Sequence, residues 1–155
     1  MKRDSKLSVA LHILTHLAIV GDRPIISDVM AAHLGTNPVV VRRSLAGLRE
    51  AGIVTSIKGH GGGWTLARPA TSISLGEVYA VLGERAELLP RAEPDPDGCK
   101  VDAVVRSALD GFYEEANALF RRRLDAITLA DLTDDLTSRL GPSGVEDQAV
   151  DDLSA

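Results

Sequence analysis

The stretch from Asn37 to Pro69, NPVVVRRSLAGLREAGIVTSIKGHGGGWTLARP, restricts the possible folds of this chain more than any other. Its first part predicts a helix, because Asn37 is a good N-cap and Pro38 suits the first helical position, where an N–H would have no partner. Three apolar residues recur at helical spacing and would face a core: Val41, Leu45 and Leu48. Gly52 can adopt the left-handed backbone that ends a helix.

The residues that follow predict a short two-stranded ribbon. Apolar residues at 53–57 would pair with the segment WTLA at 64–67, across the glycine-rich tip KGHGGG at 58–63. A helix with two adjacent arginines, followed at once by a basic hairpin, is typical of a winged helix-turn-helix that binds DNA. We therefore expect a mainly α fold with a small two-stranded β wing.

The residues before this stretch predict two more helices. Apolar residues at steps of three and four trace one face of a helix over residues 4–20. Gly21 would end that helix, and Ser27 is expected to cap a second helix over residues 28–34 that Gly35 closes. The second and third helices, with the tight link between them, would form the helix-turn-helix unit.

Beyond the ribbon, Ser74 to Glu77 forms a capping box that opens a connecting helix. Prolines among acidic residues at 84–98 predict a loop. A long helix over residues 101–127 carries an apolar stripe about 40 Å long at 1.5 Å per residue. A small wing domain cannot cover such a stripe, so we expect it to pack against its own copy in a homodimer.

These features divide the chain into four parts. Residues 1–70 would form a winged helix-turn-helix DNA-binding domain, and residues 71–100 a connecting helix and a Pro-rich loop in a sensor region. Residues 101–140 would hold the long dimerisation helix and a short C-terminal helix. The acidic, sparsely apolar tail at 141–155 is expected to be disordered.

Composition limits where the protein acts. A chain of 155 residues is long enough to bury one hydrophobic core without stabilising cross-links. The single cysteine, Cys99, cannot form an internal disulfide. The N-terminal apolar run is interrupted by His12, Thr15 and His16, so it makes a poor signal peptide and is too short and polar to span a membrane. We expect a cytoplasmic protein without membrane association.

The net charge of −5 hides a strong asymmetry. Residues 1–69 carry nine Lys and Arg and four Asp and Glu, whereas the remainder carries eight Lys and Arg and eighteen Asp and Glu. A basic first half attracts phosphates, and an acidic second half suits a surface that faces solvent or a partner. The local sign of charge therefore favours DNA binding more than the total suggests.

Three motifs in this order resemble a known family, the IscR/NsrR-type (Rrf-two) winged-helix repressors of bacteria. They are SLAGLREAGIVTSIKGHGGGWTLAR at 44–68, SLGEVY at 74–79 and ITLADL at 127–132, and the resemblance covers about residues 1–138. It implies a homodimer with two winged heads, joined through the long helix and bound to a pseudo-palindromic operator in double-stranded DNA. It further implies a repressor without catalytic residues that answers a small-molecule effector or a redox signal.

The better-known family members hold an iron–sulfur cluster on three cysteines around the loop before the long helix. Here the segment from Glu84 to Lys100 offers only Cys99, and one thiolate cannot hold such a cluster. The chain therefore resembles the cluster-free, CymR/YwnA-like branch, and we expect neither a cofactor nor a metal. Cys99 would lie at the start of the long helix, where it is a candidate redox sensor or an ordinary small residue.

Candidate DNA contacts lie on the third helix, the wing and the N-terminus. Arg42 and Arg43 are expected to read base edges, because arginine is the commonest bidentate reader of guanine; phosphate contact or plain solubility is the alternative. Lys58 and His60 are expected to enter or straddle the minor groove. The candidate set is Lys2, Arg3, Asn37, Val39, Val40, Arg42, Arg43, Arg49, Lys58, His60, Gly61 and Gly62.

Other residues allow competing interpretations. His12 and His16, four apart on a helix, could share a metal, but no carboxylate or cysteine is near in sequence, and a polar helix face or a dimer contact is favoured. Trp64 is expected to pack the wing onto the domain rather than to stack on bases. For Asn37, Val39 and Val40, capping and packing explain the residues as well as DNA contact does.

Three other classes of function remain open at this point. A metal- or cluster-dependent sensor would use Cys99 and histidines, which are few. An enzyme would need a nucleophile–base pair or paired carboxylates in a pocket, and no such set is evident. A winged helix used only for protein contacts would not need the arginine pair and the basic wing.

Overall fold

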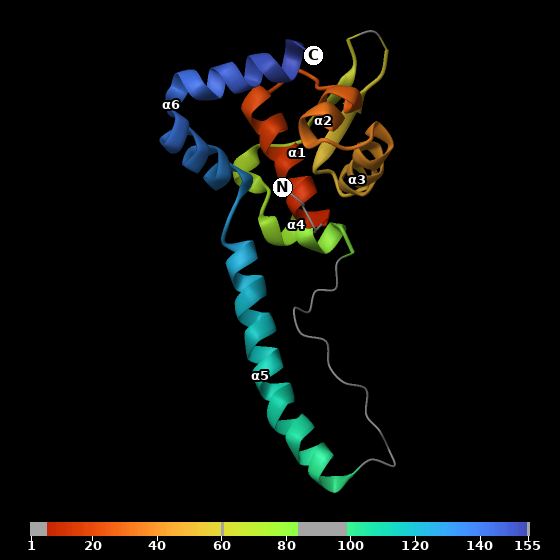
Figure 1. Ribbon diagram of the computed structural model, residues 1–155, viewed down its shortest axis with the longest axis vertical. Helices are drawn as coiled ribbons and strands as arrows, with labels where there is room; N and C mark the ends of the chain where they lie inside the picture. Colours follow the sequence, from red (N-terminus) through yellow and green to blue (C-terminus); the bar gives the residue numbers. More distant parts are fainter. Residues whose placement is uncertain (1–5, 60, 84–98, 155) are drawn as a thin grey trace.

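The computed structural model describes residues 6–59, 61–83 and 99–154 (Figure 1). The helices and strands are α1 (Lys6–Val20), α2 (Ser27–Leu34), α3 (Pro38–Glu50), β1 (Val54–Ile57), β2 (Gly63–Leu66), the 3₁₀ turn η1 (Ala70–Ser72), α4 (Leu75–Val81), α5 (Lys100–Asp125) and α6 (Leu129–Ser154). The predicted fold class, mainly α with one two-stranded antiparallel sheet and one long helix, is confirmed.

The core lies mainly within the described part of residues 6–83, which we call the head, and Leu129 of α6 completes it. Helix α1 lies at its centre and contacts α3, α4, α6 and β2. The apolar face predicted for α3 is fully buried, since Val41, Leu45 and Leu48 are each 0% exposed. Burial of this face holds α3 firmly enough for its other side to serve as a binding surface.

The wing is anchored to the head by a third extended segment. Strands β1 and β2 pair from Val54 opposite Leu66 to Ile57 opposite Gly63. Ile25 forms a bridge to Trp64 on the other side of β2, through two backbone hydrogen bonds of 2.9 and 3.0 Å. A Cβ at Gly63 would lie 2.8 Å from the Ile25 carbonyl, so only glycine allows this close approach.

Trp64 packs the wing onto the head, as the sequence predicted. It is half-buried, and its indole Nε1 donates a 3.0 Å hydrogen bond to the Ser27 hydroxyl. The expectation that Ser27 caps α2 was therefore wrong. Ser27 is the first residue of α2, Ile26 precedes it without a side-chain cap, and the hydroxyl is used to hold the tryptophan instead.

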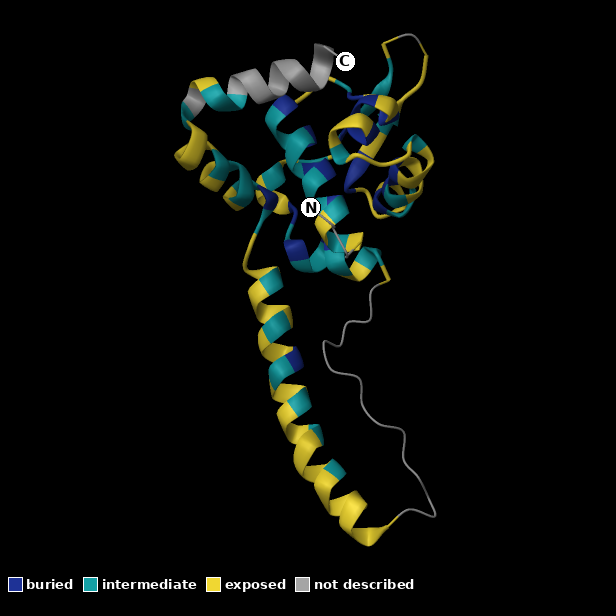
Figure 2. Ribbon diagram, viewed as in Figure 1, coloured by how far each residue is buried: buried dark blue, intermediate teal, exposed yellow. Residues whose placement is uncertain are grey.

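Helix α5 projects from the head as a long arm (Figures 1 and 2). It contacts α4, where the Tyr79 and Phe120 rings meet edge to face with centroids 5.4 Å apart. At the base of the arm, Leu75 N–H donates to the Ile127 carbonyl (2.8 Å) and Leu129 N–H donates to the Ile73 carbonyl (3.0 Å). This pair of hydrogen bonds, which we call the junction, ties the end of the arm to the start of α4.

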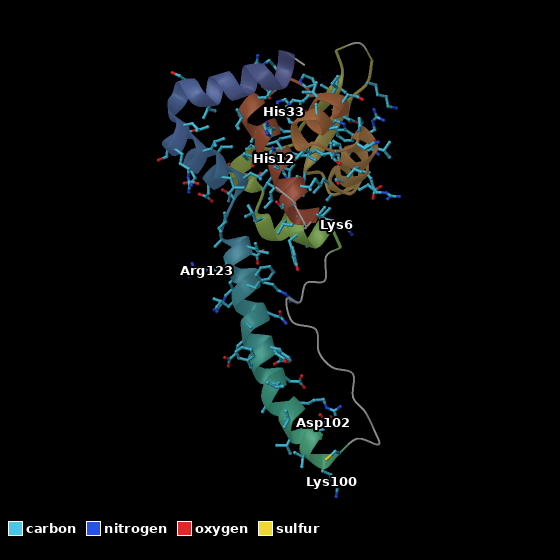
Figure 3. The ribbon with its side chains drawn as sticks, viewed as in Figure 1. Lys6, His12, His33, Lys100, Asp102 and Arg123 are labelled. Atoms are coloured by element: carbon cyan, nitrogen blue, oxygen red, sulfur yellow. The ribbon has the colours of Figure 1, made fainter. Side chains whose placement is uncertain are left out.

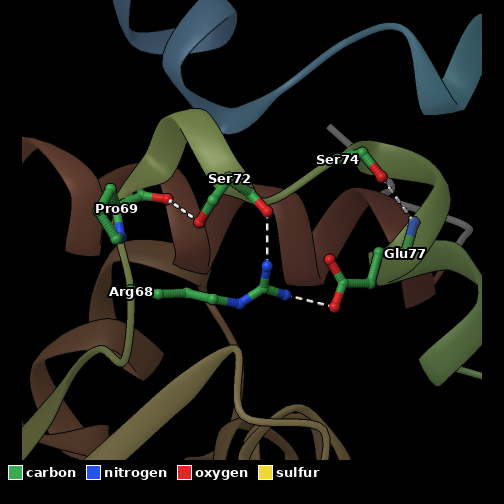
Figure 4. A network of polar contacts seen from close by, with 5 residues as sticks. All are labelled: Arg68, Pro69, Ser72, Ser74 and Glu77. Carbon is green, nitrogen blue, oxygen red and sulfur yellow. Dashed lines mark hydrogen bonds and ion pairs between the residues drawn. The ribbon is translucent and has the colours of Figure 1, made fainter.

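A polar network connects the exit of the wing to the same region (Figure 4). The Arg68 guanidinium donates to the Ser72 carbonyl and pairs with the Glu77 carboxylate. The hydrogen bond that Arg68 donates to the Glu77 carboxylate raises the pKa of Arg68, although burial acts in the opposite direction. Ser74 accepts a 3.1 Å hydrogen bond from Glu77 N–H, which confirms the predicted cap of α4.

The C-terminal segment differs from the prediction. We expected disorder from residue 141 to 155, but α6 continues to Ser154 with a break at Gly141 (φ 75°, ψ 167°). Proline suits the first turn of a helix, so Pro142 allows the helix to restart after the glycine. Helix α6 as a whole packs against α1 and α2, and near its start Leu129 belongs to the core while Leu132 packs against it.

The start of α6 yields a prediction about acid stability. Asp131 accepts hydrogen bonds from the Thr128 backbone N–H and hydroxyl, both 2.7 Å, and these lower its pKa from the ordinary value of 3.8. A depressed pKa in the folded state adds stability that is present above pH 3.8 and is lost as the pH falls through the folded-state value. We expect Asp131→Ala to lower the free energy of unfolding in urea near pH 7, and the difference from wild type to shrink below about pH 4.

The matched control is Asp134→Ala, which removes an exposed carboxylate one turn further along the same helix. This variant should keep the wild-type pH dependence below about pH 4. Parallel pH curves for wild type and Asp131→Ala would contradict the assignment.

Candidate nucleic-acid interface

Helices α2 and α3 form the predicted helix-turn-helix, and the backbone of their link is tightly specified. Gly35 ends α2 in the left-handed conformation (φ 60°), and Thr36 N–H donates 2.9 Å to the Ala31 carbonyl. The Asn37 side chain then accepts a 2.8 Å hydrogen bond from Val39 N–H, with Pro38 at the first helical position. Both predictions about the start of α3 are confirmed.

The outward face of α3 is exposed and carries most of the candidate contacts. Val39 and Val40 are 64% and 46% exposed, and Arg42 and Arg43 are also exposed. Val39 and Val40 thus form a small apolar patch beside the two arginines. The structure therefore brings four of the predicted residues together on one surface, with Asn37 at its edge.

The arginines of α3 differ in what they contact. Arg42 lies 3.4 Å from the Asp28 carboxylate of α2, in an exposed ion pair that contributes little to stability. Arg49 lies with its guanidinium carbon 6.0 Å from the centre of the Trp64 ring, which draws it toward the base of the wing. Within the described residues, Arg43 makes no hydrogen bond or ion pair.

The wing extends the same surface beyond β1 and β2. Lys58 is exposed at its tip, whereas His60 lies outside the described residues. A Cβ at Gly62 would lie 2.2 Å from the Ile57 carbonyl oxygen, so this glycine is required for the turn itself. Gly61 (φ 77°) also adopts a conformation that favours glycine. The geometry of the tip thus accounts for both glycines whether or not DNA approaches them.

One further candidate, Cys99, lies away from this surface, and two more lie outside the described residues. Lys2 and Arg3 lie outside the described residues. Cys99 is exposed and directly precedes α5, at the far end of the arm from the head, next to Lys100 (Figure 3). A role for Cys99 as a redox sensor stays a prediction.

The structure adds a histidine that sequence reasoning left aside. The His12 and His16 side chains on α1 are stacked, with their Nε2 atoms 2.8 Å apart. His33 of α2 joins them, with its ring centre 5.6 Å from that of His16. Its proximity depends on how α1 and α2 pack, which no local pattern reveals. In the described part of the chain, no group of three or more His, Cys, Asp or Glu is placed to hold a metal ion.

Comparison with known proteins decides the family. A family model described as Rrf2, an iron-dependent transcriptional regulator, matches residues 3–135. The chain belongs to the Rrf2 family. The HTH-type transcriptional regulator YwnA of Bacillus subtilis is 34% identical over 133 residues, which cover 86% of this chain and 98% of YwnA. The HTH-type transcriptional repressor NsrR of Streptomyces coelicolor is 28% identical, over 80% of this chain and 82% of NsrR.

A solved structure supports the same assignment. CymR of B. subtilis, described as a global cysteine regulator, has a TM-score of 0.61 and 25% identity, over 86% of this chain and 97% of CymR. These Rrf2 relatives are transcriptional regulators and not enzymes, which confirms that part of the prediction. No helix within the described residues is long and apolar enough to cross a membrane.

The iron named in the family description does not fit this chain's ligands. An iron–sulfur cluster is held by several thiolates, and the whole sequence contains one cysteine. That cysteine is exposed, and the three clustered histidines lie in the head, at the other end of the molecule (Figure 3). We therefore derive no role for iron in this Rrf2 protein.

The start of α3 supports a direct test of the helix-turn-helix geometry. Asn37→Ala removes the acceptor for Val39 N–H, and we expect it to lower the free energy of unfolding by about 1 kcal/mol in urea. Thr36→Ala is the matched control, because Thr36 is exposed and its bond to Ala31 is made by the backbone. A loss of the same size in both variants would show that the cap does not stabilise α3.

Proposed function

We propose that this Rrf2 protein is a dimeric, sequence-specific DNA-binding repressor that works without an iron–sulfur cluster. The observation that carries the proposal is the outward face of α3. There Arg42 and Arg43 are exposed beside a wing whose tip carries Lys58, in a family of transcriptional regulators. A basic helix face flanked by a basic ribbon fits the major groove and the adjacent backbone of duplex DNA.

The bases and the phosphates would be contacted by different residues. Arg42 and Arg43 project from a helix narrow enough to enter the major groove, where arginine can donate two hydrogen bonds to guanine. Lys58 projects from the wing tip and would meet phosphates, together with Lys2 and Arg3 of the N-terminus. The Arg42–Asp28 pair is exposed and weak, so DNA can replace Asp28 as the partner at little cost.

The exposed apolar side of α5 supports a homodimer. Helix α5 is 26 residues long, and within its described length only Asn117 is buried. Large apolar side chains lie open along the helix: Val101, Val104, Val105, Leu109, Phe112 and Leu119 are all 41% exposed or more. A stripe of this length on a single helix is far more than a soluble monomer usually leaves in water. A second copy of α5 would cover it by side-chain interdigitation.

Two joined heads would recognise a pseudo-palindromic operator. Two-fold symmetry places two copies of α3 facing successive major grooves, about 34 Å or one helical turn apart. An effector, or a change at Cys99, would alter repression only if it favoured one spacing of the heads over another. DNA binding would place the protein with the chromosome, in the cytoplasm.

The division of roles between α3 and the wing can be tested by titration. The probe is the DNA directly upstream of the protein's own gene, with random DNA as the control, measured at several salt concentrations. We expect Arg42→Ala to relax sequence preference at a cost of about 1–3 kcal/mol, because a bidentate base contact is lost. Lys58→Ala should weaken binding to both DNAs about equally and reduce the salt dependence. An equal loss on both DNAs for both variants would contradict this division.

The dimer can be tested independently of DNA. Phe112→Asp and Leu119→Asp each place a charge on the exposed apolar side of α5, where Phe112 is 61% and Leu119 51% exposed. We expect either change to convert the dimer to a monomer in sedimentation velocity, because a buried, unpaired carboxylate costs several kcal/mol. Ala103→Asp is the control, since helical spacing places this exposed residue on the side of α5 opposite Phe112 and Leu119. A wild-type protein that sediments as a monomer would overturn the dimer.

A further inference from the structure

A hollow of about 330 Å³ lies beside the outward face of α3. Val40, Arg43 and Gly47 of α3 form one wall, and Val81 and Leu82 at the end of α4 form the other. Lys6, the first described residue of α1, also lines it, and Figure 3 shows Lys6 near α4. Its volume is at the lower end of the range for small-molecule sites, and mostly apolar walls with a few polar groups are typical of them.

The charge of this hollow has one sign. Among the described residues, Lys6 and Arg43 line it and no Asp or Glu does. Two other hollows of similar size differ in this respect. The one between the end of α1 and the exit of β2 contains Asp22, and its cation, Arg68, is already bound to Glu77 and the Ser72 carbonyl. The one between α1 and α6 is lined by histidines, with no Lys or Arg among the described residues that line it.

The Arg43 guanidinium is the group best placed to receive a ligand. Within the described residues it makes no hydrogen bond or ion pair, whereas Arg42 and Arg68 both pair with carboxylates. A guanidinium can bind a carboxylate through two parallel hydrogen bonds. The valine and leucine walls beside it would exclude a bare hydrated anion but would accept a hydrocarbon body.

We propose that this hollow binds a small organic carboxylate with an apolar body, and that its occupation withdraws Arg43 from DNA. The carboxylate would bind the Arg43 guanidinium near Lys6, and the apolar body would lie between Val40 and the end of α4. Because Arg43 and Val40 also belong to the proposed DNA face, the ligand and the operator compete for the same side chains. The effect on DNA rests on the proposed function, whereas ligand binding itself does not.

The site can be tested with octanoate as the probe, titrated into the full-length protein in a calorimeter. Octanol tests the hydrocarbon chain without the charge, and acetate and inorganic phosphate test the charge without the chain. We expect one octanoate per chain, with the three other compounds bound at least about tenfold more weakly, because each lacks either a charge-assisted hydrogen bond or the apolar contact. Equal binding of octanol, or binding of phosphate alone, would overturn the proposal.

Two variants locate the bound octanoate. Ser44→Phe fills the hollow from α3 and keeps both cations, and Ala80→Phe adds the same ring on an exposed position of α4 outside the hollow. We expect Ser44→Phe to reduce octanoate affinity at least about tenfold and Ala80→Phe to leave it unchanged, because apolar contact supplies much of the binding. Unchanged affinity in a folded Ser44→Phe protein, as judged by circular dichroism, would overturn the site.

A measurement on the wild-type protein tests the same site without relying on a variant that could fail to fold. In methyl NMR spectra, octanoate should shift the signals of Val40, Val81 and Leu82 and leave those of Leu66 and Leu136 in place. Shifts confined to other methyl groups would place the ligand elsewhere and overturn the proposal.

The consequence for DNA is measured by fluorescence anisotropy with the upstream DNA at fixed salt. Saturating octanoate should weaken DNA binding at least about tenfold, since it removes one charge-assisted contact, and octanol should not. Normal DNA binding that octanoate does not change would overturn the competition and leave the proposed function intact. Octanoate shifts at Val40 and Val81 in a protein that binds no DNA would support the ligand site and contradict the proposed function.

Discussion

The arrangement of the molecule depends on the two backbone hydrogen bonds of the junction. Leu75 N–H to the Ile127 carbonyl and Leu129 N–H to the Ile73 carbonyl hold together two segments more than fifty residues apart in sequence. Ile73 and Leu129 are both 0% exposed, so the bonds lie at the edge of the core and are shielded from competing water. Within the described residues, the junction brings together the start of α4, the end of α5 and the start of α6, and the Tyr79–Phe120 ring contact adds a second attachment between head and arm.

The DNA-facing surface depends on a second set of constraints, which act on the backbone. Gly63 allows the link between α1 and α2 to pair with the wing. The hydrogen bond from the Trp64 indole to the Ser27 hydroxyl also ties the wing to the first residue of α2. The wing is therefore fixed to α2 as well as to α3. A binding surface made of one helix and one ribbon needs this shared support, because an isolated two-stranded ribbon is only marginally stable in water.

Local patterns predicted the elements well, and contacts between distant segments account for what they missed. The cap at Asn37, the buried face of α3 and the exposed long helix follow from spacing and residue type alone. The hydroxyl of Ser27 looked like a cap because serine is common there, but its actual partner, Trp64, is 37 residues away. The approach of His33 to His16 likewise depends on how α1 and α2 pack, and the helix that follows Gly141 is not indicated by the composition of that segment. The candidate hollow combines α1, α3 and α4, so no motif could have revealed it.

Helix α5 is attached near one of its ends, so a small rotation at the junction moves its other end a long way. Its 26 residues extend about 39 Å at 1.5 Å per residue, and only its end near the head is held by other elements. A rotation of about 10° at the junction would move the far end by about 7 Å, roughly a fifth of the 34 Å that separates half-sites on DNA. A displacement too small to disturb the core could thus change which operator spacings a pair of heads can span.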